Sequence, residues 1–381
     1  MQKAKLQNQN LPKGWRKVKL GEWLEFKYGF SLPEKERIKG EIPVYGSSGI
    51  VGWHNKQAVS GKGIIIGRKG NVGVVYFSDG PFYPIDTVYF IDSLKKGGDL
   101  KFFYYLLKTI NFQKVDINVG VPGLNRDTAH SLDIFIPEDS SEQRRIASIL
   151  SAFDDKIELN NKINKTLEEM AQAIFKEWFT KNQKAKIKKQ KLSELVEIIS
   201  GYPFSSKLYT RNKKALGVIT IKNVQDGNFI PVCNSFIGKE SILKNMNPEC
   251  RIKNGDILLS LTGNVGRVCF VYGEEYLLNQ RVAKLKPKRE NDRAFCYFLF
   301  RQPTLQNQFI NMAKGSAQPN LSPVETGEIV LDIPLREVLD EFNEILNPIY
   351  NRLVRNALEN QKLAELRDLL LPKLMSGEIR V

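Results

Sequence analysis

The stretch from Ser141 to Phe179 reads SEQRRIASILSAFDDKIELNNKINKTLEEMAQAIFKEWF and contains no proline or glycine. Nearly every step between its apolar residues is three or four positions, a spacing that keeps one face of a helix apolar along its length. These residues are Ile146, Leu150, Phe153, Ile157, Ile163, Leu167, Met170, Ile174 and Trp178. At 1.5 Å per residue the helix would be roughly 55–60 Å long, more than a small domain can cover. We therefore expect a second element to pack on it.

That second element is predicted at the C-terminus, where Arg336–Met375 repeats the pattern. A shift of 196 positions takes Leu150, Phe153, Ile157, Leu167, Met170, Ile174 and Trp178 to Leu346, Ile349, Leu353, Leu363, Leu366, Leu370 and Leu374. The same shift takes Asn160 to Asn356 and Asn164 to Asn360. Buried asparagines fix the register and orientation of paired helices, although these four could also lie just off the seam and be exposed. We predict that the two helices pack antiparallel.

Composition narrows the class of protein. With 381 residues and 42% hydrophobic content, the chain can form two or three domains with cores of their own. A net charge of +15 favours an anionic partner, most often nucleic acid, although a lysine-rich surface can also simply aid solubility.

Four cysteines without a C-x-x-C pair indicate reduced thiols in a cytoplasmic protein. Residues 1–11 lack the apolar core of a signal peptide, and no run approaches the roughly 20 apolar residues that span a bilayer. We therefore expect no membrane partner. Two histidines leave little material for a metal site, and we predict none.

Each long helix follows a globular segment, and the second segment repeats the first. Trp15–Pro137 is predicted to contain short strands divided by glycine turns, an aromatic helix at Phe102–Leu107 and a loop at Asn118–Arg126 before the last strand. Lys186–Pro334 shows the same order, and the tetrapeptide Gly70–Gly73 recurs identically at residues 263–266. The predicted fold class is α+β: two similar globular α/β domains separated by two long helices packed as an antiparallel coiled coil, with an internal pseudo-twofold repeat.

Two diverged readers on a helical spacer would suit an asymmetric, two-part DNA target, because dimeric DNA-binding proteins read two half-sites in a comparable way. The chain resembles the specificity subunit of type I restriction–modification enzymes, over essentially its whole length. The motifs that carry the resemblance are Leu11–Trp15 with Lys19–Glu22, Ile42–Ile50, Gly67–Gly73, Ile136–Pro137 with Glu142–Ala147 and Leu150–Asp154, and Leu371–Ile379.

The resemblance implies a division of labour. Residues 1–140 and 183–334 would be target recognition domains, and residues 141–182 and 335–381 would be the helical spacer. The chain would bind double-stranded DNA and dock two methyltransferase subunits that methylate adenine N6. Restriction subunits would join the assembled complex. S-adenosylmethionine, ATP and Mg²⁺ would belong to these partner subunits, and this chain would hold no cofactor and do no chemistry.

Residues that read bases are expected on exposed turns and to be Arg, Lys, Asn or Gln. The candidates in the first copy are Arg68, Lys69, Asn71, Asn118, Asn125 and Arg126. In the second copy they are Asn264, Arg267, Asn279, Gln280, Arg281, Gln318 and Asn320. Glycine turns also simply connect hairpin strands, so a purely structural role remains an alternative for each of these residues.

Two other functions are alternatives. A self-contained methyltransferase or nuclease would need cofactor motifs, but the sequence has no G-x-x-x-x-G-K-[ST] phosphate loop. Asn347–Tyr350 resembles a methyltransferase catalytic tetrapeptide, yet it lies inside the periodic C-terminal helix and we assign it no such role. A coiled-coil scaffold with incidental basic charge is the other alternative, and the salt dependence of DNA binding would separate it from a DNA reader.

Overall fold

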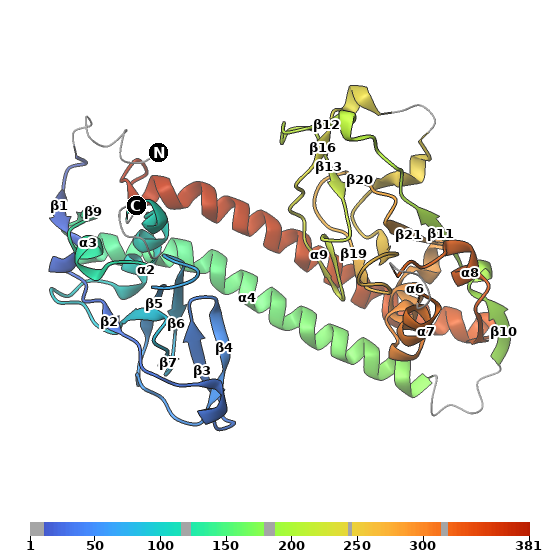
Figure 1. Cartoon of the computed structure of the whole chain (residues 1–381), viewed down its shortest axis with the longest axis horizontal. Helices are drawn as coiled ribbons and strands as arrows, with labels where there is room; N and C mark the ends of the chain where they lie inside the picture. The colour runs from blue at the N-terminus through green and yellow to red at the C-terminus, as the bar shows by residue number, and fades with distance from the viewer. Residues whose placement is uncertain (1–10, 116–122, 179–186, 243–245, 314–318) are drawn as a thin grey trace. The chain divides into compact units, whose positions relative to one another are not determined.

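The computed structural model describes residues 11–115, 123–178, 187–242, 246–313 and 319–381. These residues form two compact units (Figure 1). Unit 1 comprises residues 1–156 and 363–381, and unit 2 comprises residues 157–362. Both long helices, α4 (Ser140–Lys176) and α9 (Arg336–Met375), contribute one part to each unit. The division therefore cuts across the two helices, and neither unit consists of a continuous stretch of chain with a helix attached.

Unit 1 contains one four-stranded sheet and two smaller ones. Strand order in the large sheet is β2-β8-β5-β6, and β4-β3-β7 and β1-β9 form the others. The strands are β1 (Trp15–Lys19), β2 (Lys27–Tyr28), β3 (Ile42–Gly46), β4 (Gly49–His54), β5 (Gly63–Gly67), β6 (Val75–Ser78), β7 (Tyr83–Pro84), β8 (Val88–Ile91) and β9 (Asp133–Pro137). The helices are α2 (Leu100–Thr109) and α3 (Arg126–His130), with 3-10 turns η1 (Leu20–Glu22), η2 (Glu34–Glu36) and η3 (Phe112–Lys114).

The core of unit 1 joins the sheet to both long helices. All five residues of β5 are buried, because the strand pairs with β6 and β8 on its two edges and is covered on both faces. Aromatic residues of α2 pack on this sheet. Ile146 and Leu150 of α4 and Leu374 and Met375 of α9 belong to the same buried cluster. The predicted apolar faces are therefore buried in unit 1 at these positions, whereas Leu366, predicted on the same face of α9, is 48% exposed.

Unit 2 has the same central sheet and a larger second one. Strand order is β11-β21-β18-β19 in the four-stranded sheet and β12-β16-β13-β20-β17 in the five-stranded one, with β10-β22 and β14-β15 as separate pairs. The strands are β10 (Ile187–Lys191), β11 (Val196–Ser200), β12 (Tyr209–Thr210), β13 (Leu216–Ile219), β14 (Val224–Gln225), β15 (Asn228–Phe229), β16 (Phe236–Ile237), β17 (Arg251–Ile252), β18 (Ile257–Ser260), β19 (Val268–Phe270), β20 (Tyr276–Leu278), β21 (Val282–Pro287) and β22 (Val330–Pro334). The helices are α5 (Leu192–Leu195), α6 (Arg293–Phe300), α7 (Pro303–Ala313) and α8 (Pro323–Gly327), and the 3-10 turns are η5 (Ser206–Leu208), η6 (Lys239–Ser241), η7 (Pro248–Cys250) and η8 (Glu290–Asp292).

The two units repeat one topology. Both four-stranded sheets are antiparallel, and in each the strand that comes last in sequence lies between the first and the second, β8 between β2 and β5 and β21 between β11 and β18. The first and last strands of each globular segment also pair antiparallel, Trp15 opposite Pro137 and Ile187 opposite Pro334. The prediction of two similar α/β domains is thus confirmed. The extra strands of unit 2 account for the insertions that lengthen its sequence.

The repeated tetrapeptide adopts the same turn twice. The N–H of Gly73 donates to the carbonyl of Gly67 at 2.8 Å, and that of Gly266 donates to Ser260 at 3.1 Å. Gly73 and Gly266 have φ angles of +76° and +84°, in the left-handed region that favours glycine. Glycine is therefore required at these positions by backbone conformation, which explains why the letters survived while the surrounding sequence diverged.

Within unit 2, asparagines connect α4 and α9. Asn160 Nδ2 donates to Asn360 Oδ1 at 2.9 Å, and Asn356 Nδ2 donates to Asn164 Oδ1 at 2.7 Å. Numbers on α9 rise as those on α4 fall, so the helices run in opposite directions here. Asn160 and Asn356 are 0% and 1% exposed. The prediction that these asparagines lie in the seam is confirmed, and the alternative of an exposed position is wrong for both.

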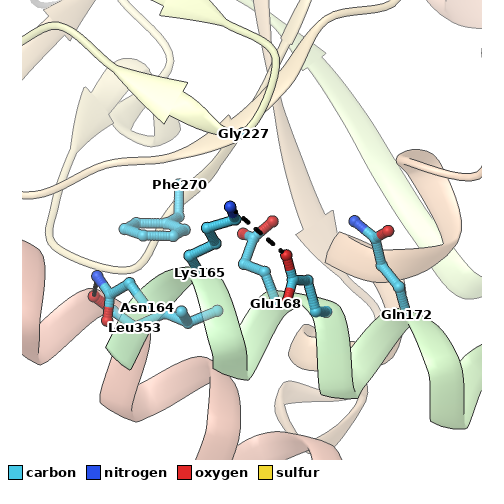
Figure 2. A pocket seen from close by; sticks show the side chains of 8 residues that line it. Asn164, Lys165, Glu168, Gln172, Gly227, Phe270 and Leu353 are labelled. Atoms are coloured by element: carbon cyan, nitrogen blue, oxygen red, sulfur yellow. Dashed lines mark hydrogen bonds and ion pairs between the residues drawn. The ribbon is translucent and has the colours of Figure 1, made fainter. Parts of the chain in front are cut away.

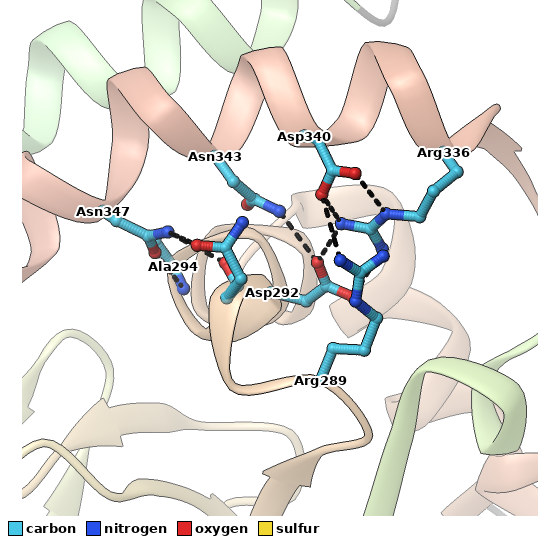
Figure 3. A network of polar contacts seen from close by, with 8 residues as sticks. Arg289, Asp292, Ala294, Arg336, Asp340, Asn343 and Asn347 are labelled. Atoms are coloured by element: carbon cyan, nitrogen blue, oxygen red, sulfur yellow. Dashed lines mark hydrogen bonds and ion pairs between the residues drawn. The ribbon is translucent and has the colours of Figure 1, made fainter.

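Polar contacts also attach the aromatic helices to the long ones. In unit 1 the hydroxyl of Tyr105 on α2 donates to Asp154 of α4, at 2.6 Å, and Arg367 of α9 pairs with the same carboxylate. In unit 2 the start of α6 is fixed to α9 by buried Asp292, which accepts from Arg336 and Asn343 (Figure 3). Removing such a carboxylate would leave buried donors unpaired. Within the described part of the chain, no helix combines the length and apolar character needed to cross a membrane.

We predict that Gly73→Ala destabilises the protein more than Gly266→Ala. A methyl group at residue 73 would lie 2.4 Å from Phe112 Cβ, whereas one at residue 266 would lie 3.4 Å from Phe309 Cβ. Both variants bear the cost of the left-handed backbone, about 1–2 kcal/mol, and overpacking adds about 1–3 kcal/mol at residue 73 alone. Urea unfolding followed by circular dichroism measures both losses. Gly80→Ala, which would meet nothing within 4 Å, is the control; equal losses in the first two variants would contradict the prediction.

Candidate nucleic-acid interface

The two predicted DNA-reading segments of unit 1 meet the turn before β8 at one end of the four-stranded sheet. The turn after β5 begins at Arg68, whose N–H donates to the carbonyl of Thr87 at 2.9 Å, in the turn before β8. The N–H of Leu124 donates to the carbonyl of Arg68, also at 2.9 Å, and Lys69 forms a β-bridge with Gly123. Segments far apart in sequence thus form one surface.

In unit 2 the corresponding segments meet in the same way, but with different residues. The place where these segments meet is called the junction of each unit. The N–H of Leu261 donates to the carbonyl of Arg281 at 3.0 Å, and that of Leu321 donates to Leu261 at 2.8 Å. Thr262 forms a β-bridge with Asn320. The turns that carry Asn264 and Arg267, Asn279–Arg281, and Asn320 therefore converge, as their counterparts do in unit 1. Backbone hydrogen bonds hold both junctions, so side chains there can vary without loss of the framework.

The predicted side chains of unit 1 differ in solvent exposure and in the hydrogen bonds that they form. Lys69 and Asn71 are exposed, and Asn71 donates to Ser48 Oγ at 2.9 Å. Arg68 is half-buried and donates to the carbonyl of Asp86. Asn125 caps α3, because its Oδ1 accepts from the N–H groups of residues 127 and 128. Its amide oxygen thus has a structural task, whatever else the residue does.

Unit 2 shows the same range. Gln280, Arg281 and Asn320 are exposed at the junction. The Oδ1 of half-buried Asn279 accepts from the N–H of Arg281 at 3.3 Å, which fixes the turn. The guanidinium of Arg267 donates to Gln225. With its oxygen turned toward Arg267, the amide of Asn264 also accepts from that guanidinium at 3.1 and 3.2 Å. Asn118 and Gln318, predicted in the same two loops, lie outside the described residues.

Tyr28 is a site residue that the sequence reasoning missed. It stands on β2 with 46% of its surface exposed. The guanidinium carbons of Arg68 and Arg126 lie 4.8 and 5.3 Å from its ring centroid. The available signal was the alternation of Tyr28 and Phe30 around Gly29, which places two aromatic rings on one face of a strand. That alternation does not reveal which arginines reach the ring.

One recess in unit 2 lies between α4 and the adjoining strands, and its carboxylate already has structural partners. The recess has a volume of about 310 Å³ and is lined by one face of α4, from Asn164 to Gln172, and by Gly227, Phe270 and Leu353 (Figure 2). Its most buried carboxylate, Glu168, is already paired with Arg301 and accepts from the hydroxyl of Tyr297 at 2.8 Å. That carboxylate stabilises the contact between α4 and α6, and it has no nucleophile beside it to activate.

Thiol and metal chemistry find no support among the described residues either. Burial raises the pKa of the Cys269 and Cys296 thiols well above their usual range, so neither forms a thiolate nucleophile readily. Burial also raises the pKa of Cys233, to about 11. Across the described part of the chain, no three His, Cys, Asp or Glu side chains gather as metal ligands would. Asn347, of the tetrapeptide set aside above, donates to the carbonyl of Asn291 at 2.9 Å and thus has a structural role in α9 (Figure 3).

The two α/β domains repeat one fold, and each has a polar junction at one end of its sheet. The protein therefore has two similar polar surfaces. The family described as type I restriction modification DNA specificity domain matches residues 12–169 and 184–368. The chain therefore belongs to the family of type I restriction–modification specificity subunits.

Individual relatives agree with this assignment. The chain is 26% identical over 329 residues to the type I restriction enzyme HindI specificity subunit of Haemophilus influenzae, a match that covers 68% of this chain and 71% of that protein. It is 24% identical to the MjaVIII specificity subunit of Methanocaldococcus jannaschii, covering 97% and 94% of the two chains. The crystal structure of an S subunit from M. genitalium has a similar fold, with a TM-score of 0.67, 19% identity, and coverage of 96% and 97%.

Exposed cations at the junctions should contribute to DNA affinity through phosphate contacts. We predict that Lys69→Ala and Arg281→Ala, each made in the complex of this chain with its partner subunits, weaken DNA binding and reduce the slope of log K against log salt by about 0.9 per lost phosphate contact. Fluorescence anisotropy with labelled duplex at several salt concentrations measures both. Lys189→Ala removes an exposed cation of β10 outside these segments and should leave the slope unchanged. A slope that stays at the wild-type value in Lys69→Ala and Arg281→Ala would exclude phosphate contact by these two residues.

Proposed function

We propose that this chain reads an asymmetric, two-part DNA target and docks two adenine-N6 methyltransferase subunits, without catalysis of its own. Residues 1–140 and 183–334 are the target recognition domains, and residues 141–182 and 335–381 are the spacer. The observation that carries this proposal is the repeated junction: the same backbone hydrogen bonds, Leu124 to Arg68 and Leu321 to Leu261, hold loops whose side chains differ. A common frame with different side chains suits two readers of unlike half-sites.

The side chains at the two junctions support the asymmetry. Exposed or half-buried at the junction are two arginines, a lysine, a tyrosine and two asparagines in unit 1, and two arginines, a glutamine and three asparagines in unit 2. Arginine pairs with guanine in the major groove, and Asn or Gln pairs with adenine. The predicted contact residues are Arg68, Lys69, Asn71, Asn118, Asn125 and Arg126 for one half-site. For the other half-site they are Asn264, Arg267, Asn279, Gln280, Arg281, Gln318 and Asn320.

The helices are proposed to act as a coiled-coil spacer with pseudo-twofold symmetry. The shift of 196 positions takes Asn160 to Asn356 and Asn164 to Asn360. Under this shift the hydrogen bond from Asn160 to Asn360 becomes the one from Asn356 to Asn164, and both are present. Such an exchange of partners is the signature of an isologous twofold contact. One chain would thereby supply the symmetry that dimeric DNA readers obtain from two chains.

The partners follow from the family. Two methyltransferase subunits would dock on the helices, one for each repeat, and restriction subunits would join them. S-adenosylmethionine, ATP and Mg²⁺ would bind those partner subunits, and this chain's share of the reaction would be to position a chosen adenine before the methyltransferase. A methyltransferase active site cannot enclose adenine N6 while the base is stacked in the duplex, so the partner would have to extrude the base after this chain has bound.

We predict that the chain mixed with DNA and labelled S-adenosylmethionine transfers no methyl group, and that adding its cognate methyltransferase subunit gives methylation at one two-part sequence. Sequencing of methylated adenines defines both halves and their gap. Methyl transfer by the chain alone would instead favour a self-contained methyltransferase. A complex that binds DNA with no sequence preference and no salt dependence would favour a scaffold.

A matched insertion tests the spacer. Unit 1 meets unit 2 in the chain between Lys156 and Ile157 on α4 and between Lys362 and Leu363 on α9. One heptad inserted at each point keeps the apolar period and adds about 10.5 Å, so we predict a gap about three base pairs wider, at 3.4 Å per base pair, with both half-site sequences retained. A heptad inserted in α4 alone shifts one apolar face against the other and should abolish assembly. An unchanged gap in the doubly extended protein would refute the spacer.

A further inference from the structure

Unit 1 carries at its junction a basic and aromatic cluster that includes two residues outside the predicted contact list. The cluster consists of Tyr28, Tyr89, Arg68 and Arg126. Its two rings meet edge to face, with centroids 5.1 Å apart. Arg68 Cζ lies 4.8 Å from the Tyr28 centroid and 5.7 Å from that of Tyr89, and Arg126 Cζ lies 5.3 Å from Tyr28. Both guanidiniums therefore lie within about 10 Å of each other over one exposed ring.

The cluster is held from three sides. The hydroxyl of buried Tyr89 donates to the carbonyl of Leu124 at 2.9 Å. This hydrogen bond fixes the backbone two residues before Arg126. Arg68 Nη1 donates to the carbonyl of Asp86 at 3.3 Å. Arg126 lies 3.7 Å from the carboxylate of Asp127, which is itself exposed. Each guanidinium thus keeps most of its five donors available to a ligand, while stacking limits its orientation.

Unit 2 has the same backbone hydrogen bonds at its junction but lacks the cluster. Gly29 donates to the carbonyl of Val88 as Gly201 does to that of Val282, which makes Ser200 the counterpart of Tyr28 and Ala283 that of Tyr89. The junction hydrogen bonds make Leu261 the counterpart of Arg68.

Asn125 and Ser322 cap α3 and α8, and the next residues, Arg126 and Pro323, are therefore counterparts. All four members of the cluster are replaced in unit 2 by residues without an aromatic ring or a positive charge, although the backbone frame is retained.

The replacement of the cluster in unit 2 helps to decide whether the cluster binds DNA phosphates or base edges. Phosphates are the same along all DNA, so a phosphate anchor fits both half-sites equally and gives no reason for the two copies to differ at this cluster. Base edges differ between half-sites, so residues that read them are the ones that diverge. Guanine presents O6 and N7 in the major groove, which an arginine fork contacts with two hydrogen bonds. We infer that Tyr28 positions Arg68 and Arg126 to read guanine in the half-site bound by unit 1, an inference that rests on the proposed function.

The test uses the complex of this chain with its methyltransferase subunits. The half-site read by unit 1 is identified first, as the half that changes when Trp15–Pro137 are exchanged for the corresponding segment of a related chain. Methylation rates are then measured on the wild-type target and on every single base-pair change in it, at several salt concentrations. The variants are Arg68→Gln, Arg126→Gln, Tyr28→Phe and Tyr28→Leu.

The wild-type half-site is expected to contain a G·C pair. Arg68→Gln or Arg126→Gln should lower discrimination at that pair roughly 5- to 150-fold, the range for losing one two-bond guanine contact, with the other half-site unaffected. Tyr28→Phe keeps the ring and should retain discrimination, whereas Tyr28→Leu should lose part of it. Arg16→Gln is the matched control, because exposed Arg16 stacks 5.3 Å from Trp23 outside the junction; it should change nothing.

Other outcomes would overturn the inference. Weakening that is uniform across sequences, with a salt slope lower by about one, would make the arginines phosphate contacts. Unchanged discrimination in both arginine variants, or loss in both half-sites, would also overturn it. If Arg68→Gln fails to assemble, Arg68→Lys keeps the charge without the fork and should show the same loss. A wild-type complex with no sequence-specific methylation refutes the proposed function itself, whereas a specific wild type with unaltered variants refutes the cluster alone.

Discussion

The hydrogen bonds between asparagines of α4 and α9 are the constraint on which the rest of the chain depends. A neutral hydrogen bond adds only about 0.5–1.5 kcal/mol net, and a buried amide without a partner costs about 1–3 kcal/mol. Any slip of one helix against the other would exchange the first term for the second at the amide nitrogens of Asn160 and Asn356, both of which are buried. Leucines alone would tolerate such a slip. The amides thus select one register for the parts of α4 and α9 that belong to unit 2.

Because the two α/β domains are copies of one fold, they can be compared with each other residue by residue. What both copies retain is backbone: the left-handed glycines Gly73 and Gly266, and the hydrogen bonds from Leu124 and Leu321 into the turn after the central strand. What differs is the set of side chains standing on that backbone. Main-chain hydrogen bonds satisfy the junction without help from side chains, so substitutions there change the surface at little cost in stability. Substitutions at the junction can therefore change which DNA sequence is preferred, while the hydrophobic core stays the same.

Periodicity and repetition predicted the features that depend on local spacing. The long helices, their seam asparagines and the matching heads could all be read from the sequence, because helix faces follow a period of 3.6 and the tetrapeptide ending at Gly73 recurs. Contacts set by tertiary structure could not. Tyr28, Arg68 and Arg126 meet only because β2, the turn after β5 and the start of α3 converge on one end of a sheet. The capping role of Asn125 was likewise hidden, because a polar loop residue before a five-residue helix also looks like a free ligand.

The cluster in unit 1 is compatible with an open surface even before DNA arrives. Two unit charges 10 Å apart in water repel by about 0.4 kcal/mol, whereas each exposed cation–π contact contributes about 0.5–1 kcal/mol. The cation–π contacts with the Tyr28 ring therefore oppose a repulsion of this size, and the carboxylate of Asp127, 3.7 Å from Arg126, reduces it further. Arginines that already have their binding geometry lose less side-chain entropy when a base edge is bound. Rigidity of this kind favours discrimination between bases, since a fork held in one orientation cannot adapt to the wrong acceptor pattern.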